Sequence, residues 1–389
     1  MKKLFLLFIL FFVSIRVLPQ THFNNFVQRV NSSADTNFKS AEVDSFMNYA
    51  KSSGVPFIEN DTVCFLYRGN AAQVNLAGDF TNWQPDIKLK RLAGTNLFYY
   101  IKTFENNARL DYKLVVDTAR WIPDPLNPNQ VAGGYGQNSE LAMPGYVKPW
   151  EIKYYDNEKH GTLRNQSVFS VLTSSSYQLQ IYLPPGYDSV SASEYPSVYF
   201  QDGTDYTDLG DAINILDNLI DSNKIKPVIG IFVRPNNRNI EYAESKRNQY
   251  ASFFENELTH FIDSCYNTIK APSGRLVLGD SFGGNISALI AYNRPDVFGN
   301  CGLQSAAFWP NKYEVYNLIT NGAAKHVKIH SVWGSYESLS SNLKDFDTIL
   351  SKKGYQIKCA EYPEGHSWGL WKAHLDDMLI YFFPAKGAD

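Results

Sequence analysis

Apolar runs that alternate with longer helical stretches fill the C-terminal part of the chain and constrain its fold more than any other feature. Seven short segments have strand character. They are residues 177–183, 197–201, 228–233, 275–279, 301–305, 329–333 and 357–362. Alternation of this kind predicts a mostly parallel sheet with helices on both faces. Residues 161–389 are therefore expected to form one α/β domain.

The region in front of this domain has a different pattern. Four short alternating runs between residues 62 and 117 are separated by turn residues, which predicts a small antiparallel sandwich over residues 56–125. Residues 126–160 are dense in Pro, Gly and Asn and are typical of an extended linker or docking strap. Residues 21–55 form a polar, partly helical lead-in. Two domains also suit a length of 389 residues, because one core usually splits beyond about 250–300 residues.

The N-terminus carries a leader pattern. Lys2 and Lys3 precede a ten-residue apolar run, Leu4 to Val13, which is typical of a secretory signal peptide and too short to span a membrane. We expect residues 1–20 to be a signal peptide and the mature protein to be secreted or periplasmic. The net charge of −3, without a long run of like charge, gives no electrostatic case for binding nucleic acid or an anionic membrane surface.

Cysteine spacing predicts neither a disulfide framework nor a metal site. Cys64, Cys265, Cys301 and Cys359 are scattered and form no CxxC pair, so we expect buried free thiols. No cluster of His with Cys or with carboxylates has metal-ligand spacing. The sequence therefore predicts no catalytic metal and no cofactor.

A glycine-flanked serine follows the predicted strand at residues 275–279. The stretch GDSFGG satisfies G-x-S-x-G with Gly279, Ser281 and Gly283, and a helical stretch follows it. Glycines are needed there because the tight turn strains the serine and crowds the flanking Cα atoms. This context predicts a nucleophile elbow that presents Ser281. The alternative is an ordinary small-residue turn of an α/β sheet.

A triad on this elbow requires an acid and then a histidine later in the chain. Of the later histidines, His366 lies in a Gly-containing loop directly after the strand at residues 357–362, where it can reach Ser281 as a general base. Glu337 is the first carboxylate after the strand at residues 329–333 and is the predicted acid. Asp345 and Asp347 follow on a predicted helix and remain alternatives.

Two further sets of residues are expected around the serine. The backbone amides of Phe282 and Thr204, or of its neighbour Gly203, are predicted to form the oxyanion hole, although a simple turn at Asp202–Gly203 would explain the second position equally. Aromatic side chains near the same sheet edge are predicted to line a substrate pocket, with packing as the alternative for each. They are Phe308, Trp309, Trp368 and Trp371.

Five motifs occur in order and together resemble a known family. They are IYLPPGY, YFQDG, GDSFGG, WGSYE and EGHSW. The chain between about residues 165 and 385 looks like the esterase D and enterochelin-esterase-like branch of the α/β-hydrolases, relatives of carbohydrate esterase family 1 with its acetylxylan and feruloyl esterases. The resemblance implies Ser281 as nucleophile, His366 as base and Glu337 as acid, although many relatives carry aspartate at the acid position.

The front region, from VNLAGDFTNW to WIPDP, is similar to early-set, immunoglobulin-like domains of the glycogen-binding type. The resemblance puts Trp83, Trp121 and Lys113 where such domains stack against and hydrogen-bond sugars. Core tryptophan is the commoner role in small sandwiches, and we favour it. In enterochelin-type esterases a comparable front domain helps to form the wall of the active site.

The sequence thus predicts an α/β-hydrolase preceded by a small all-β immunoglobulin-like sandwich. Its expected activity is that of a secreted serine esterase acting on polysaccharide acetyl or feruloyl esters, or on siderophore esters. The alternatives are an acyltransferase with a sugar acceptor and a catalytically degenerate carbohydrate-binding protein. Three arginines could grip an anionic siderophore, although Arg238 is expected to pair structurally with Glu241. They are Arg234, Arg238 and Arg247.

Overall fold

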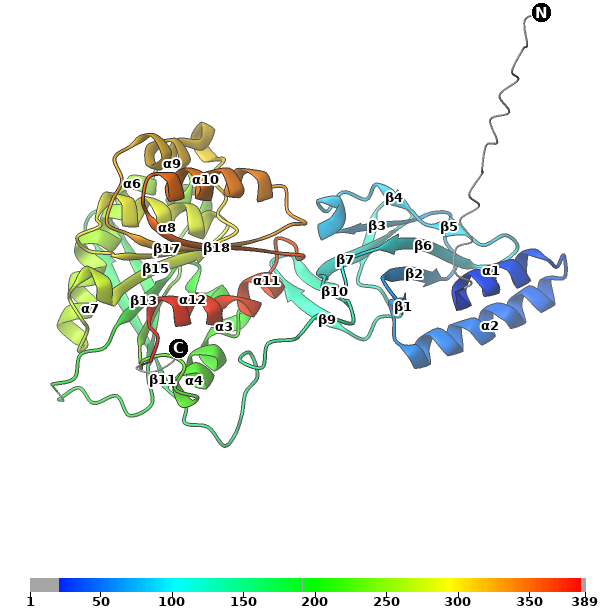
Figure 1. Ribbon diagram of the computed structural model, residues 1–389, viewed down its shortest axis with the longest axis horizontal. Helices are drawn as coiled ribbons and strands as arrows, with labels where there is room; N and C mark the ends of the chain where they lie inside the picture. Colours follow the sequence, from blue (N-terminus) through cyan, green and yellow to red (C-terminus); the bar gives the residue numbers. More distant parts are fainter. Residues whose placement is uncertain (1–20, 191, 386–389) are drawn as a thin grey trace, which may run out of the picture.

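The protein consists of a small front domain and a larger α/β domain that meet along one face (Figure 1). The structure, a computed structural model, describes residues 21–190 and 192–385. The predicted leader at residues 1–20 lies outside the described residues. Within the part that the structure describes, no helix is long and apolar enough to cross a membrane.

The front domain is a sandwich of two antiparallel sheets. The first sheet has the order β1 (Phe57–Glu59), β2 (Thr62–Arg68), β6 (Leu97–Thr103) and β5 (Lys90–Arg91). The second has the order β4 (Ile87–Lys88), β3 (Val74–Gly78), β7 (Arg109–Val116), β10 (Gly136–Ala142) and β9 (Gln130–Gly133), and β8 (Arg120–Ile122) also pairs with β7. A short 3₁₀ turn, η1 (Asp79–Thr81), follows β3. Apolar side chains from both sheets, among them Phe65, Leu76 and Tyr112, are buried between them.

The predicted linker is shorter than expected, because β9 and β10 belong to the sandwich. β10 pairs with β7 from Ser139 opposite Tyr112 to Ala142 opposite Arg109. The glycine-rich stretch between β9 and β10 is their hairpin turn, where Gly136 has a φ of +86° that favours glycine. The front domain therefore extends to Ala142, and the linker begins after it.

The predicted lead-in forms two helices that cover the first sheet. α1 (His22–Asn31) and α2 (Thr36–Ser53) start at the side-chain caps Thr21 and Asp35. Their apolar faces bury Phe26 and Phe46, whose rings stack at 4.2 Å. The lead-in is thus an integral layer of the front domain.

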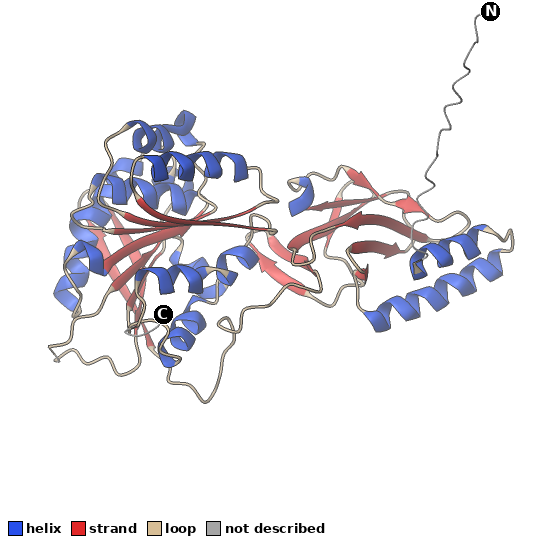
Figure 2. Ribbon diagram, in the orientation of Figure 1, coloured by secondary structure: helices blue, strands red, loops and turns tan. Residues whose placement is uncertain are grey.

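The α/β domain is built on a mixed eight-stranded sheet, seen edge-on in Figure 2. In spatial order the strands are β11 (Thr162–Ser170), β12 (Ser175–Leu183), β14 (Ile229–Val233), β13 (Ser197–Phe200), β15 (Arg275–Asp280), β16 (Asn300–Gln304), β17 (Lys328–Gly334) and β18 (Gln356–Tyr362). The six strands β14, β13, β15, β16, β17 and β18 are parallel to one another. β12 pairs antiparallel with both β14 and β11. The expectation of a mostly parallel sheet missed β11, because this edge strand exposes most of its side chains and has no apolar run.

Helices cover both faces of this sheet. One face packs against α3 (Gly203–Asp208), α4 (Ala212–Asp221), α11 (Trp368–Ala373) and α12 (Leu375–Phe382). The other packs against α5 (Arg238–Tyr242), α6 (Arg247–Ser252), the π-helical turn η2 (Phe253–Leu258), α7 (Thr259–Cys265), α8 (Phe282–Asn293), α9 (Pro310–Asn321) and α10 (Ser340–Lys352), and a 3₁₀ turn, η3 (Pro272–Gly274), precedes β15. The carboxyl ends of β17 and β18 point toward the front domain (Figure 1), which places the loops after them at the domain boundary.

Candidate active site

Ser281 sits on a sharp turn between β15 and α8. Its φ of 51° and ψ of −117° are strained for a residue with a side chain, at a typical cost of about 1–3 kcal/mol. The turn is possible because the residues two positions before and after the serine, Gly279 and Gly283, have no side chains. A Cβ at Gly279 would lie 2.5 Å from the backbone carbon of Gly283. The local geometry is that of the predicted elbow, with Ser281 partly exposed at its apex.

A chain of hydrogen bonds joins Ser281, His366 and Glu337. Ser281 Oγ lies 3.0 Å from His366 Nε2, and His366 Nδ1 lies 2.7 Å from Glu337 Oε2. Because a carboxylate only accepts hydrogen bonds, Nδ1 carries the proton and donates it, and this tautomer leaves the Nε2 lone pair facing the serine hydroxyl. The three residues arrive from the loops after β15, β17 and β18, which lie at one edge of the sheet.

The surroundings of His366 favour its protonated form. Its side chain is 33% exposed, and partial burial alone lowers the pKa of the imidazole. The hydrogen bond and charge of Glu337 outweigh this effect, and Asp280 and Asp79 add to it, so the pKa of His366 is raised above 6.5. The site can therefore stabilise an imidazolium that forms during a proton transfer.

Glu337 is fixed by three donors. Besides the imidazole, Ser305 Oγ donates to Glu337 Oε1 at 2.6 Å and the Gly334 amide donates at 2.5 Å. Ser305 Oγ in turn accepts a hydrogen bond from the Trp371 indole at 3.0 Å. The side chain of Glu337 is 1% exposed, so its carboxylate has one orientation, toward His366.

The alternative acids are held elsewhere. Asp345 is exposed on α10. Asp347 is buried on the same helix, where burial raises its pKa to about 7, and its side chain has no hydrogen bond to His366. The structure therefore brings only Glu337, of the three predicted candidates, into contact with the imidazole.

Two backbone segments meet beside Ser281. Asp202, with a φ of +51°, ends the turn after β13, and Gly203 and Thr204 begin α3. A Cβ at Gly283 would lie 3.1 Å from Gln201 Cβ, so this turn packs directly on the elbow. Over residues 21–190 and 192–385, the amides of Thr204 and Phe282 have no intramolecular acceptor. Free amides at two helix starts are suitable donors to an anionic oxygen.

Arg238 links these two segments. Its guanidinium contacts Asp202 Oδ2 at 2.8 Å, the carbonyl oxygen of Asp280 at 3.3 Å and the ring of Phe282 at 5.5 Å. The expected pair with Glu241 is wrong, because Glu241 instead accepts hydrogen bonds from Tyr177 and from backbone amides. Arg238 contacts two other buried carboxyl groups instead, those of Asp202 and Asp280.

The carboxylates beside Arg238 resist ionisation. Burial raises the pKa of Asp202 to about 8, an effect that Arg238 opposes and Asp280 reinforces. Burial likewise raises the pKa of Asp280. Sequence analysis missed this cluster, because nothing in a linear pattern places Asp202, Asp280 and Arg238 together. Of the other two arginines singled out in the sequence, Arg234 is exposed between β14 and α5, and Arg247 pairs with Glu314.

Three of the four predicted pocket residues, Phe308, Trp368 and Trp371, are buried, and only Trp309 is exposed. Phe308 is fully buried and packs against Phe346, with ring centroids 4.4 Å apart, so its assignment to a pocket was wrong. Trp368 is 6% exposed and packs edge-on against Tyr206, so it too belongs to the core. Phe308 and Trp368 belong to the two apolar clusters that pack on opposite faces of the sheet. Trp309, by contrast, is 53% exposed, and its ring centroid is 4.9 Å from that of Phe282.

The expectation for the cysteines holds in part. All four are free thiols, and Cys64 and Cys301 are buried, but Cys265 and Cys359 are exposed. Cys265 ends α7 and Cys359 lies on the edge strand β18, positions that a linear pattern does not distinguish from the core. In the described ranges, no group of three His, Cys, Asp or Glu side chains could hold a metal ion.

The front-domain residues singled out for sugar contact lie in different places. Trp121 is 44% exposed on β8 and pairs with Val115, which shares a face of β7 with Lys113. Trp83 is half-buried and donates its indole N–H to Asp79 at 3.1 Å. The core role favoured for tryptophan is wrong for Trp121.

A scan against family models gives a match to the esterase family over residues 170–382, more than half of the chain. The chain belongs to this esterase family. Ester hydrolysis is the activity that this family supports. The matched segment contains Ser281, Glu337 and His366.

Two curated proteins are similar to this chain over part of its length. It is 28% identical over 237 residues to the uncharacterized protein YjcH of Bacillus subtilis, which covers 57% of this chain and 97% of that protein. It is 29% identical over 163 residues, 39% of this chain and 22% of the relative, to an endo-1,4-beta-xylanase/feruloyl esterase of Xylanibacter ruminicola.

A solved structure extends the likeness to both domains. The enterobactin esterase FES of Shigella flexneri superposes with a TM-score of 0.69 at 19% identity, covering 82% of this chain and 92% of that chain. This coverage is more than the α/β domain alone can supply. The two-domain architecture is therefore shared with that enzyme, whereas the likeness by itself shows only the fold.

Proposed function

We propose that this protein is a serine carboxylic-ester hydrolase that acts through an acyl-serine intermediate. The observation that carries the proposal is the hydrogen-bonded chain from Ser281 through His366 to Glu337. Such a chain couples a nucleophile to a base and the base to an orienting acid. The esterase family to which the chain belongs supports the same reaction class.

Acylation begins when Ser281 Oγ attacks the ester carbonyl carbon while His366 Nε2 accepts the hydroxyl proton. Glu337 holds the tautomer and stabilises the imidazolium that forms. The carbonyl oxygen becomes an oxyanion, and the free amides of Phe282 and Thr204 are the donors that we assign to it. The tetrahedral intermediate then collapses, and the imidazolium proton leaves with the alcohol. An acyl-serine remains.

Deacylation repeats these steps with water. His366 accepts a proton from the attacking water molecule, and the acid is released when the proton returns to Ser281 Oγ. If a sugar hydroxyl replaced this water, the same site would be an acyltransferase. Product analysis with and without a sugar acceptor distinguishes the two reactions.

For the substrate, we propose polysaccharide acetyl or feruloyl esters, or siderophore esters. Trp309 offers an exposed aromatic surface 4.9 Å from Phe282, and Arg238, whose side chain is 33% exposed, adds a cation beside it. Feruloyl and siderophore esters combine an aromatic ring with polar groups and suit these neighbours. The leader pattern of residues 1–20 supports a secreted or periplasmic location for the esterase.

The decisive experiment compares Ser281→Ala with Ser287→Ala. Ser287 lies on the same helix but is buried away from the site, so it is a matched control. We expect wild type and Ser287→Ala to hydrolyse p-nitrophenyl acetate and to react with a fluorophosphonate probe, and Ser281→Ala to do neither. Normal turnover by folded Ser281→Ala would refute the mechanism.

A contact between the front domain and a glycan is a second proposal. It is supported by Trp121, which is 44% exposed on the same sheet as Lys113. Exposed tryptophan suits the apolar face of a sugar ring. We expect retention on a glycan affinity gel that Trp121→Ala abolishes. Retention without Ser281-dependent turnover would favour a pure carbohydrate-binding protein over an esterase.

A further inference from the structure

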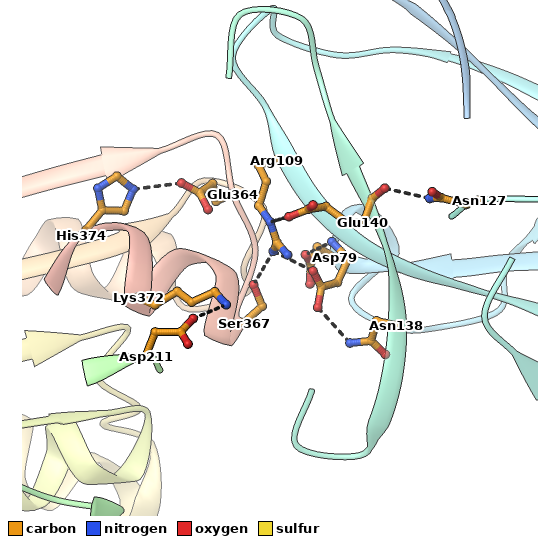
Figure 3. A network of polar contacts seen from close by, with 11 residues as sticks. Asp79, Arg109, Asn127, Asn138, Glu140, Asp211, Glu364, Ser367, Lys372 and His374 are labelled. Carbon is orange, nitrogen blue, oxygen red and sulfur yellow. Dashed lines mark hydrogen bonds and ion pairs between the residues drawn. The ribbon is translucent and has the colours of Figure 1, made fainter. Parts of the chain in front are cut away.

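The loop that carries His366 is held from outside the α/β domain. This His366 loop, residues 363–367, follows β18 and lies against the front domain (Figure 3). We propose that Arg109 of the front domain is a positioning residue that fixes the His366 loop, so that the front domain completes the active site. The proposal rests on the proposed esterase function, which it deepens.

Arg109 reaches the loop with both its backbone and its side chain. Its amide donates to the Pro363 carbonyl at 3.1 Å, and it forms an isolated parallel bridge with Glu364. Its guanidinium donates through Nη1 to Ser367 Oγ at 3.2 Å. Arg109 therefore binds the His366 loop on both sides of the histidine.

The guanidinium itself has a fixed position. It is 1% exposed and pairs with Asp111 at 2.6 Å and with Glu140 at 2.8 Å. Figure 3 shows Glu140 on the side of the front domain and Ser367 on the other. A planar guanidinium with several fixed partners holds one orientation better than a lysine ammonium would. The side chain thus acts as a rigid strut between the two domains.

Glycines allow this close approach. A Cβ at Gly369 would overlap the guanidinium of Arg109, and a Cβ at Gly365 would overlap the carboxylate of Asp79. Asp79 is held in turn by the Asp111 amide at 2.7 Å. Because Gly365 directly precedes His366, the front domain packs flush against the backbone that carries the imidazole.

The front domain also touches the loop that carries Glu337. Tyr336, its neighbour, donates its hydroxyl to Glu105 at 2.5 Å and packs against Phe104 at 6.1 Å. The Tyr336 amide donates to the Glu364 carbonyl at 3.0 Å, which joins the two loops. Both loops that orient the imidazole are therefore in contact with the front domain, and Arg109 is a buried cation in the contact with the His366 loop.

Arg109 contacts neither Ser281 nor His366, so we expect it to change catalysis only through the position of the loop. A misplacement of about 1 Å can reduce a rate by roughly 100-fold. Loss of the strut should therefore lower kcat by about 10- to 100-fold and leave KM within about twofold. Amide hydrogen exchange over residues 363–367 should become faster at the same time.

The test uses the full chain with substitutions that remove the arginine and both of its carboxylate partners together. Arg109→Met alone would leave the carboxylates of Asp111 and Glu140 unpaired, so it is combined with Asp111→Asn and Glu140→Gln, which make all three side chains neutral. Arg109→Lys serves as the conservative variant, and its kcat should lie between that of the triple variant and that of the wild type. Arg275→Lys is the matched control, since Arg275 is a buried arginine, paired with Asp263 at 2.5 Å, at the opposite end of β15 from Ser281.

We expect Arg275→Lys to leave kcat and the exchange of residues 363–367 unchanged. The proposal is overturned if the folded triple variant keeps wild-type kcat and wild-type exchange in this loop. It is also overturned if Arg275→Lys lowers kcat as much, because the effect would then be general destabilisation. Failure of the proposed esterase function would be a separate result, because the wild type would then not react with the fluorophosphonate probe at Ser281. The exchange of residues 363–367 would still show whether Arg109 fixes the loop.

Discussion

Ser281 and His366 face each other across 3.0 Å, yet different parts of the molecule hold them. The serine side is local. Its elbow lies between β15 and α8 and packs on the adjacent turn at Gln201 and Asp202, within one domain. The histidine side depends on contacts across a domain boundary, where Arg109 binds the loop at Pro363 and Ser367.

The difference teaches how this fold divides its tasks. A nucleophile on a strained turn needs close backbone packing, which neighbouring strands of one sheet supply. A general base needs a loop long enough to bring an imidazole over the serine, and a loop at the sheet edge gains support from whatever covers that edge. In this protein the front domain, a β-sandwich of the same polypeptide chain, covers that edge of the sheet.

The largest expected effect tests whether the two sides act as a unit. Ser281→Ala and His366→Ala should each reduce kcat/KM for p-nitrophenyl acetate by about 10⁴-fold or more, because neither side forms the nucleophile alone. The double variant should lose no more than the single variants. Additive losses would mean that the serine and the histidine act independently.

The next effect concerns the acid on the histidine side. Glu337→Gln keeps the shape but removes the charge, and kcat should fall by about 10²- to 10⁴-fold. The wild-type rate should rise with pH as His366 loses its proton, with a midpoint above 6.5, since Glu337 raises the pKa of the imidazole.

In Glu337→Gln this midpoint should move to lower pH, because burial then dominates the pKa of His366. Rates of the wild type and of Glu337→Gln, measured from pH 5 to 9, give the two midpoints. An unchanged midpoint would exclude Glu337 as the partner that sets it. Asp347→Asn, on the neighbouring helix, is the control and should leave the midpoint in place.

A smaller effect is expected on the serine side. Arg238→Met removes the cation that joins Asp202 to Asp280, and the turn at Gly203 and Thr204 should loosen. We expect kcat to fall by about 10- to 100-fold, less than or similar to the loss of an oxyanion donor. Arg234→Met, at an exposed position between β14 and α5, should leave kcat unchanged. Equal activity of the two folded variants would show that the pairing does not shape the oxyanion site.

The smallest effect concerns substrate contact. Trp309→Ala should raise KM for an aromatic ester by about two- to tenfold, because a stacked pair contributes about 0.5–1.5 kcal/mol, and leave kcat nearly unchanged. Steady-state kinetics on p-nitrophenyl acetate and on methyl ferulate measure this. Trp121→Ala, exposed on the front domain, is the control for a small ester. If Trp309→Ala changes neither substrate's KM, Trp309 is not part of the binding surface.

Much of the fold followed from the sequence, because alternation of apolar strands with helices leaves few architectures for a buried parallel sheet. β11 escaped detection, since an edge strand with exposed side chains lacks an apolar run. β9 and β10 escaped because their glycine-rich hairpin has the composition of a linker. Pairing with β7, a non-local contact, decides that they are strands.

The sequence by itself determined the elbow at Ser281, because its glycines and its strand-to-helix setting are all local. It also predicted His366 as the base and Glu337 as the acid, with Asp345 and Asp347 as alternatives for the acid. Only the tertiary structure brought Glu337 to His366, turned Phe308 and Trp368 into the core, and moved Arg238 to Asp202 and Asp280. It also placed Arg109 against a loop more than 250 residues away, at Ser367. Those outcomes depend on which strand ends and which domains meet at one edge of a sheet, and no local pattern carries that information.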